Sequence, residues 1–351
     1  MRTFLLPLII PALLLVFSLS AVTAAAAETG VTVLIYHRFG EEKYPTTNVA
    51  VDRFREQMTF LRENGYKVIS LESLVHDLQG SRKIPEKAVV ITIDDGYRSV
   101  YENAWPVLRD FHYPFTVFLY AKATENRHSN YMTWEQVREM KNAGVDFQNH
   151  GFAHEHMAFI PPGMDMHDYR AWIRADLAAS IKILSEELDE RPRFFAVPYG
   201  EYNEIVLDEI RSSGYEAIIL QDPGSVSSDT DPLAIPREPI LGNEWSTMEH
   251  FREVLERVDL PIRREVPSAG QLPENTPKRF GAHLLYPERY VPGTIGIYVT
   301  ELGWQQATVE DDFASITNSN TLKRRINRVA VSAREKETGK TAIRFWMLVG
   351  Q

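Results

Sequence analysis

The feature that most constrains this chain is the run AVVITIDDGY at residues 88–97. Its first six residues are β-branched or small and apolar, which predicts a strand buried on both faces, as in parallel sheets. The strand ends abruptly in two carboxylates, Asp94 and Asp95, followed by Gly96. Functional groups in α/β proteins collect at the carboxyl ends of parallel strands. The run therefore predicts an α/β fold with a site at this strand end.

Strand and helix patterns alternate over about 230 residues, from residue 31 to residue 258. Apolar runs predict strands at 31–36, 88–93, 115–120, 145–149, 193–197, 216–220 and 234–236. Amphipathic patterns predict helices at 51–64, 71–78, 99–111, 133–143, 168–188, 203–213 and 246–258. Thr133 is a candidate N-cap, and Pro106 predicts a kink in its helix. This alternation predicts a mainly parallel sheet, closed or nearly closed as an irregular barrel.

The pattern changes near residue 260. Four prolines between 261 and 277 punctuate a polar stretch, which predicts a linker at 261–279. Strand patterns at 294–300, 328–332 and 341–348 follow without helices, so residues 280–351 are expected to form a small all-β, sandwich-like domain. Trp304, Tyr286 and Tyr290 are candidate platforms for sugar rings there, although we favour a structural role in the core. The preceding domain would span residues 28–260.

The N-terminus has the pattern of an export signal. Arg2 precedes an apolar run at 4–22 and four alanines at 24–27, which predicts a signal peptide at 1–27. A retained membrane anchor is the alternative. Cleavage would leave an exported protein, periplasmic or secreted, with no membrane span.

Composition narrows the chemistry and the partners. The chain has no cysteine, so disulfides and thiolate ligands are excluded. Its net charge of −10, without a basic block, argues against nucleic acid and weakly favours a neutral or cationic partner. The sequence does not specify the oligomeric state.

Two imidazoles complete the acid pair. His150 and His154 follow the predicted strand at 145–149, and two histidines with one carboxylate match a catalytic zinc site with open positions. Asp95 would bind the metal, and Asp94 would remain free to accept a proton from a water molecule there. His156 is a weaker candidate ligand.

Three motifs resemble those of NodB-like polysaccharide deacetylases, carbohydrate esterase family 4. TIDDG at 92–96 resembles the family's TFDDG motif, HGFAH at 150–154 its H-[ST]-x-x-H motif, and FAVPYG at 195–200 its R-x-P-Y-G segment. LIYHR at 34–38 further resembles the branch that de-N-acetylates poly-β-1,6-N-acetylglucosamine. The resemblance implies an irregular (β/α) barrel of the NodB type. It also implies a hydrolase that cleaves the amide bonds of an N-acetylhexosamine polysaccharide.

The resemblance also implies roles for individual residues. Asp94 maps to the catalytic base, and Asp95, His150 and His154 map to the metal ligands. Tyr199 maps to the position whose backbone N–H helps to bind the oxyanion. The implied cofactor is a divalent metal, with zinc favoured and cobalt, nickel or iron as alternatives.

The sequence departs from the family pattern at three places. The motif arginine is Ala196 here, and Arg237 is the candidate replacement, with a surface ion pair as the alternative. The late L-x-H motif reads LQD at 220–222, so His37 becomes the candidate proton donor to the leaving amine. Gly151 replaces a serine or threonine, which we expect to affect loop ordering more than metal binding.

Other activities fit the same motifs. The substrate alternatives are peptidoglycan, chitin-type oligomers and O-acetylated glycans. A carbohydrate-binding protein that kept the barrel without catalysis is the alternative from another class. The missing motif arginine and late histidine support that reading, whereas the intact acid pair and histidine pair argue against it.

Overall fold

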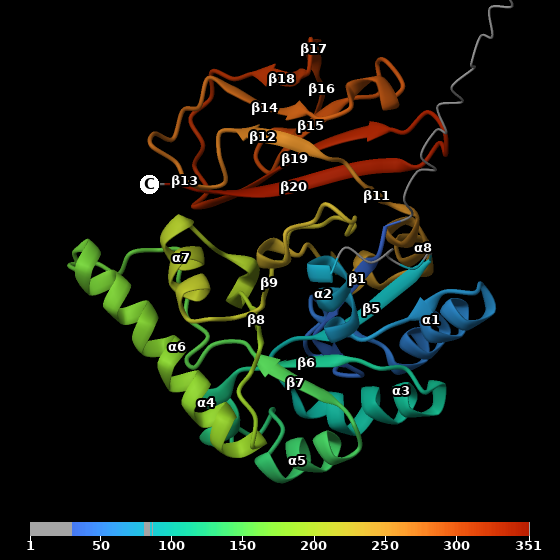
Figure 1. Cartoon of the computed structure of the whole chain (residues 1–351), viewed down its shortest axis with the longest axis vertical. Coiled ribbons are helices and arrows are strands. Elements are labelled where there is room, and N and C mark those ends of the chain that lie inside the picture. Colours follow the sequence, from blue (N-terminus) through green and yellow to red (C-terminus); the bar gives the residue numbers. More distant parts are fainter. Residues whose placement is uncertain (1–29, 81–84, 86, 351) are drawn as a thin grey trace, which may run out of the picture.

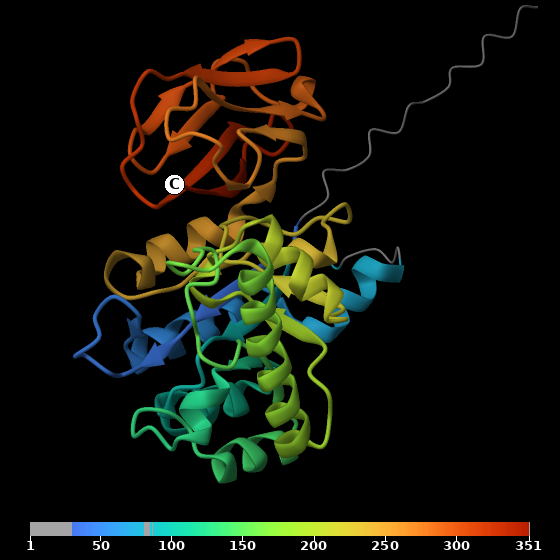
Figure 2. The same cartoon turned by 90° about the vertical axis from the view of Figure 1, so that its left-hand side faces the viewer.

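The computed structural model describes residues 30–80, 85 and 87–350. The predicted signal peptide at 1–27 lies outside the described residues. An α/β part carries an all-β part at one end (Figure 1), and a quarter turn of the view shows the two parts stacked along the long axis (Figure 2). No helix of the described residues is long and apolar enough to cross a membrane.

The α/β part is built on one parallel sheet. Its strands run in the order β10-β1-β5-β6-β7-β8-β9, and β4 also pairs with β5. Their bounds are β1 (Thr32–Tyr36), β4 (Lys67–Val68), β5 (Ala88–Ile93), β6 (Thr116–Leu119), β7 (Asp146–Asn149), β8 (Phe194–Ala196), β9 (Ala217–Ile219) and β10 (Glu238–Pro239). All six residues of β5 are buried, as the apolar run predicts.

A short segment closes the sheet into an irregular barrel. The Leu220 N–H donates to the Ile235 carbonyl (2.8 Å), and the Ile235 N–H donates to the Ile218 carbonyl (2.9 Å). A few residues later β10 pairs with β1, so residues 235–239 bridge the last strand and the first. The predicted barrel is confirmed, but the expected strand at 234–236 is not. Residues 232–234 form a 3₁₀ turn instead, because prolines at 232, 236 and 239 cannot donate to a continuous ladder.

Helices follow the strands as predicted. Their bounds are α1 (Val51–Glu63), α2 (Leu71–Gly80), α3 (Trp105–Phe111), α4 (Ala121–Glu125), α5 (Trp134–Asn142), α6 (Met166–Leu188), α7 (Glu204–Ser212) and α8 (Met248–Glu256). Thr133 caps α5 in a capping box with Gln136, which confirms the predicted N-cap. A π-helical turn, η1 (Val100–Ala104), precedes Pro106, where the sequence predicts a kink.

The all-β part consists of two sheets. One has the order β11-β20-β19-β15-β16 with β13 also paired to β20, and the other has the order β12-β14-β18-β17. Their bounds are β11 (Val258–Asp259), β12 (Ile262–Val266), β13 (Gly270–Gln271), β14 (Arg279–Leu284), β15 (Gly296–Val299), β16 (Gly303–Gln306), β17 (Thr308–Glu310), β18 (Phe313–Thr317), β19 (Ile326–Arg334) and β20 (Thr341–Val349). Phe280 and Ala314 of one sheet share a core with Ile297 and Val329 of the other. The small all-β, sandwich-like arrangement is confirmed.

The stretch expected as a linker is partly a strand. Residues 262–266 form β12, which pairs with β14 at an edge of its sheet. Pro261 and Pro267 flank β12 rather than interrupt it, and an edge strand needs a partner on one side only. Moreover β11, at the end of the barrel part, pairs with β20 of the sandwich. The chain therefore passes between the two parts through paired strands.

Candidate active site

The acid pair lies in a tight turn after β5. The Gly96 N–H donates to the Asp94 carbonyl (2.9 Å), and Asp95 and Gly96 have φ of 70° and 75°. A side chain at position 96 would meet Leu119 at 2.6 Å, so glycine is required there. A positive φ is unusual for an aspartate, and strain of this kind is concentrated at functional sites. The turn directs two neighbouring carboxylates into one buried site.

Arg237 is buried and bound to Asp94. Its guanidinium donates to Asp94 Oδ1 (2.6 Å) and Oδ2 (2.7 Å), and neither side chain is exposed. Its Nε donates to the Leu220 carbonyl (2.8 Å), which orients the guanidinium group. The alternative of a surface ion pair is therefore wrong for Arg237. The segment that closes the barrel delivers this side chain to the strand end that carries Asp94.

The charge on Asp94 is stabilised by its neighbours. Burial alone would raise the pKa of this carboxyl, but the Arg237 guanidinium, with help from His150, lowers its pKa overall. Two-pronged, charge-assisted hydrogen bonds favour the ionised form. Asp94 is thus ionised and available as a proton acceptor at neutral pH.

Asp95, His150 and His154 converge on one point and could hold a metal ion. His154 Nε2 lies 3.1 Å from Asp95 Oδ1 and 3.3 Å from His150 Nε2, and His150 Nε2 lies 3.4 Å from the same oxygen. Within the described part of the chain, Asp95 Oδ1 is buried without a hydrogen-bond partner. A buried oxygen of this kind beside two imidazole nitrogens fits a divalent cation.

The orientation of His150 also fits a ligand. Its Nδ1 lies 2.8 Å from the Ala196 carbonyl, an acceptor, so Nδ1 carries the proton and Nε2 offers its lone pair to the cluster. Burial lowers the pKa of His150, but the carboxylates of Asp94 and Asp95 raise it overall. Burial would raise the pKa of Asp95, yet the two imidazoles and His37 hold it well below its usual range.

His37 follows β1 and lies within the field of the same acid pair. Its Nδ1 is buried and has no hydrogen-bond partner among the described residues. Burial lowers the pKa of His37, although the charges of Asp95 and Asp94 oppose the shift. The structure therefore contains a neutral imidazole beside the two carboxylates.

Tyr199 forms the exposed rim of the site. It has a φ of 57° between two buried residues, and its side chain is 40% exposed. Its ring packs edge-on against His154 (4.4 Å between centroids) and stacks on His156 (3.8 Å). His156 is bound instead to Glu201 (2.6 Å between Nδ1 and Oε2) and lies outside the Asp-His-His cluster.

Comparison with known proteins agrees with this geometry. Residues 81–218 match the family model described as Polysaccharide deacetylase. Poly-beta-1,6-N-acetyl-D-glucosamine N-deacetylase of Escherichia coli (strain K12) is 28% identical over 245 residues, covering 59% of this chain and 36% of that protein. The protein of the same name from Staphylococcus epidermidis is 24% identical over 213 residues, covering 60% of this chain and 73% of that one. The solved structure of IcaB from Ammonifex degensii has a TM-score of 0.54 at 26% identity, covering 65% of this chain and 97% of that one.

Residues 81–218 belong to a polysaccharide deacetylase domain. The predicted family and the prediction of a hydrolase are confirmed for this domain. The match spans only about a third of the length of the E. coli relative, so the substrate of the whole protein is taken up below as a proposal.

Asp176 is a structural residue of the deacetylase domain that the sequence motifs do not indicate. Asp176 of α6 accepts hydrogen bonds from the backbone N–H groups of Phe152 and Ala153, both at 2.8 Å. It thereby orders the loop between the two metal-ligand candidates, where Gly151 has a φ of 80°. The signal was present, since Asp176 is an acid on the otherwise buried face of an amphipathic helix. The Asp176 carboxylate of α6 thus orders a loop in which Gly151 replaces the serine or threonine of the family motif and supplies no hydroxyl.

The altered late motif of the deacetylase domain, LQD at 220–222, contacts both the candidate base and the sandwich. Gln221 donates from Nε2 to Asp94 Oδ2 (3.4 Å), so it contacts the candidate base directly. Asp222, at the position of the motif histidine, is buried and accepts a hydrogen bond from the Tyr202 hydroxyl (2.5 Å). Its Oδ1 lies 3.7 Å from Nε of Arg328 on β19. This position therefore helps to attach the sandwich to the barrel.

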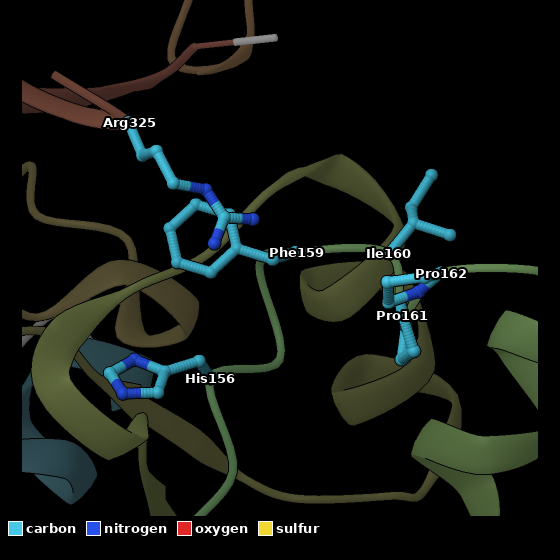
Figure 3. Close-up of a pocket in the computed structure, with 6 residues that line it drawn as sticks. All are labelled: His156, Phe159, Ile160, Pro161, Pro162 and Arg325. Carbon is cyan, nitrogen blue, oxygen red and sulfur yellow. The ribbon is translucent and has the colours of Figure 1, made fainter.

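A hollow of about 350 Å³ adjoins the site beyond Tyr199. It is lined by His156, Phe159, Ile160, Pro161, Pro162 and Arg325, and Figure 3 shows the guanidinium of Arg325 lying against the ring of Phe159. That guanidinium lies 3.6 Å from the ring centroid. Because Arg325 directly precedes β19, the deacetylase domain and the sandwich both contribute to this rim.

Proposed function

We propose that this protein is a metal-dependent hydrolase that removes N-acetyl groups from an N-acetylhexosamine polysaccharide, with poly-N-acetylglucosamine as the leading substrate. The names of the two curated relatives support this substrate. The signal-like N-terminus supports action in the periplasm or outside the cell.

One observation carries the proposal. An ionised carboxylate, Asp94, is held by two hydrogen bonds from buried Arg237, and a cluster suited to a divalent cation lies directly beside it. A general base and a metal site side by side form the arrangement that hydrolysis of an unactivated amide needs.

Asp95, His150 and His154 would hold the ion, and zinc is the favoured identity because the ligand set is nitrogen and oxygen. A bound divalent ion would polarise the amide carbonyl and make a water molecule more acidic. The Nδ1 hydrogen bond of His150 to the Ala196 carbonyl fixes the ring orientation that this role requires.

Asp94 would take the proton from the attacking water, and Arg237 would keep its carboxylate ionised and correctly directed. Water then adds to the acetamide carbonyl carbon, and the carbon–nitrogen bond breaks to give acetate and a free sugar amine. The departing nitrogen needs a proton. His37 is the candidate donor: its ring is neutral at rest, so the proton that it passes to the nitrogen would have to come from Asp94, which has just accepted one from the water molecule.

Tyr199 would stabilise the oxyanion through its backbone N–H. Its left-handed backbone conformation sets the direction of that peptide group, and the ring marks the open side through which a glycan chain could enter.

The test is release of free amine from N-acetylglucosamine oligomers with β-1,6 and β-1,4 linkages, with zinc, with chelator and with Asp94→Asn. We expect chelator-sensitive release that is lost in the variant, with faster turnover of the β-1,6 oligomer. Release from the β-1,4 oligomer alone would favour a chitin-type or peptidoglycan substrate. Absence of release from both, with stoichiometric metal bound, would contradict the proposal.

A further inference from the structure

A larger cleft lies between the deacetylase domain and the sandwich. Its volume is about 920 Å³, which leaves room for more than one sugar ring, since pockets for whole small molecules span roughly 300–1,000 Å³. One wall is α8 with the short turn η4 (Asn243–Ser246) before it, and the other is the sheet that contains β15, β16, β19 and β20. In Figure 1 strands β19 and β20 lie between the barrel and the second sheet, so this face of the sandwich is turned toward the barrel.

The sandwich wall carries a row of aromatic side chains. Strand register pairs Trp304 with Tyr298, Tyr298 with Ala330, and Ala330 with Phe345. Ring centroids are 5.3 Å apart for Tyr298 and Trp304, and 6.2 Å apart for Tyr298 and Phe345. Ile297 and Val299 beside Tyr298, and Trp346 beside Phe345, belong to the sandwich core, so alternation places Tyr298 and Phe345 on the outer face, with Trp304 as the cross-strand partner of Tyr298.

The aromatic row is accessible. Trp304 is 52% exposed, and Trp245, on the opposite wall, is 41% exposed. Tyr290, another candidate sugar platform, is buried in the core as we favoured, whereas Trp304 is not. Exposed aromatic faces beside hydroxyl-bearing Thr300 and Ser332 form an amphipathic lining. Pyranose rings bind to such linings, because their C–H faces pack on aromatic rings while their hydroxyls hydrogen-bond at the edges.

The charge of the lining selects among glycans. Arg257 is bound by Glu238 and Glu253, and Arg328 lies beside Asp222, so both cations of the cleft have carboxylate partners. Glu244 and Glu249 add two exposed carboxylates to the same lining. An anionic polysaccharide would be repelled by this surface, whereas a neutral or partly deacetylated, cationic one would not.

One residue, Gln221, links the cleft to the candidate active site. Gln221 lines the cleft and also donates to the carboxylate of Asp94. We propose that the cleft binds a stretch of the same amino-sugar chain that is deacetylated at Asp94. The sugars in the cleft would lie several units along the chain from the one that carries the reacting acetamide. This inference rests on the proposed function, and it makes the sandwich part of the substrate-binding surface.

The test compares chain lengths. β-1,6-linked N-acetylglucosamine dimer and hexamer are turned over by wild type, Trp304→Ala and Trp245→Ala, with Tyr286→Ala as an aromatic control on the sandwich outside the cleft. We expect each tryptophan variant to lower the preference for hexamer over dimer about tenfold, through KM rather than kcat. Tyr286→Ala should keep the wild-type preference.

Binding is measured separately from turnover. Hexamer is titrated into the Asp94→Asn protein, with and without Trp304→Ala, and the change in tryptophan fluorescence gives Kd. About tenfold weaker binding in the double variant supports the cleft, even if the wild type releases no amine and the proposed function fails. Unchanged hexamer preference and unchanged Kd in the folded tryptophan variants would overturn the inference, whatever the activity. Equal affinity for a hexamer of galacturonate, which is anionic, would overturn the assignment of an amino-sugar chain.

Discussion

Arg237 and Glu238 are neighbours in the chain, and each belongs to a buried carboxylate–arginine pair. The carboxyl pKa is lowered in one pair and raised in the other. Arg237 binds Asp94 through two hydrogen bonds, and the pKa of Asp94 is lowered. Glu238, the next residue, receives one hydrogen bond from Arg257 (2.8 Å), and burial raises its pKa to about 7 despite that arginine. Among the described residues Glu238 Oε1 has no hydrogen-bond partner.

The comparison shows what burial costs a carboxylate. Desolvation opposes ionisation in both pairs, and only the pair with both oxygens bound overcomes it. The two-pronged contact keeps Asp94 charged for chemistry. The single hydrogen bond leaves the pKa of Glu238 close to neutral pH. The pair of Glu238 with Arg257 attaches α8 to the barrel.

Arg237→Met should have the largest effect on activity and stability, because it removes the arginine from the first pair. The variant leaves Asp94 buried without its cation, so the pKa of Asp94 should rise, and the acidic limb of the activity profile should move to higher pH. We expect kcat/KM to fall by about 10²–10⁴-fold, and the free energy of unfolding to fall by about 3–5 kcal/mol. Amine release against pH and urea unfolding measure both effects. An unmoved acidic limb would contradict the role of Arg237.

Arg257→Met is the matched change in the other pair. At pH 8 it should lower the free energy of unfolding by about 3–5 kcal/mol, since Glu238 is left buried and charged. At pH 5 the loss should be smaller, because Glu238 can take up a proton. Turnover of the dimer by the folded protein should stay well above that of Arg237→Met. Equal loss of activity in the two variants would mean that the pairs do not differ in function.

Glu238→Gln should change how stability depends on pH. The folded pKa of Glu238 is raised from 4.5 to about 7, so the folded state retains a proton that the unfolded chain releases. Stability should therefore fall as pH rises through this window, by about 3 kcal/mol in total. The variant should lose this fall, as measured by urea unfolding at pH 5 and pH 8. Asp94 has the opposite sign, because its lowered pKa adds stability that is lost on acidification.

His37→Gln should have the smallest effect. The side chain can no longer take up a proton, so we expect kcat to fall about tenfold with little change in KM, below the roughly 10²-fold effect of a complete general acid. His76→Gln, on an exposed face of α2, is the control. A wild-type kcat in His37→Gln would assign delivery of the proton to Asp94 itself.

The local parts of the candidate site could be predicted from the sequence. The strand that ends in Asp94 and Asp95 is encoded in ten consecutive residues, and His150 and His154 follow another strand end by the same rule. Parallel strands bring their carboxyl ends to one edge, so these four residues had to meet if the barrel formed. The predicted linker was less accurate, because an edge strand between prolines resembles a linker in sequence.

The remaining parts depended on contacts between segments far apart in the chain. Arg237 lies 143 residues from Asp94, and only the closing segment of the barrel turns a solitary arginine into its partner. The aromatic row of the sandwich needs a particular register between strands, and its cleft needs the sandwich to pack on α8. The sequence by itself determined the strand ends and the residue types placed there, because local periodicity encodes both. Which buried carboxylate is charged, and which aromatic faces stay open, was decided only by the tertiary structure, because both depend on partners that no local pattern specifies.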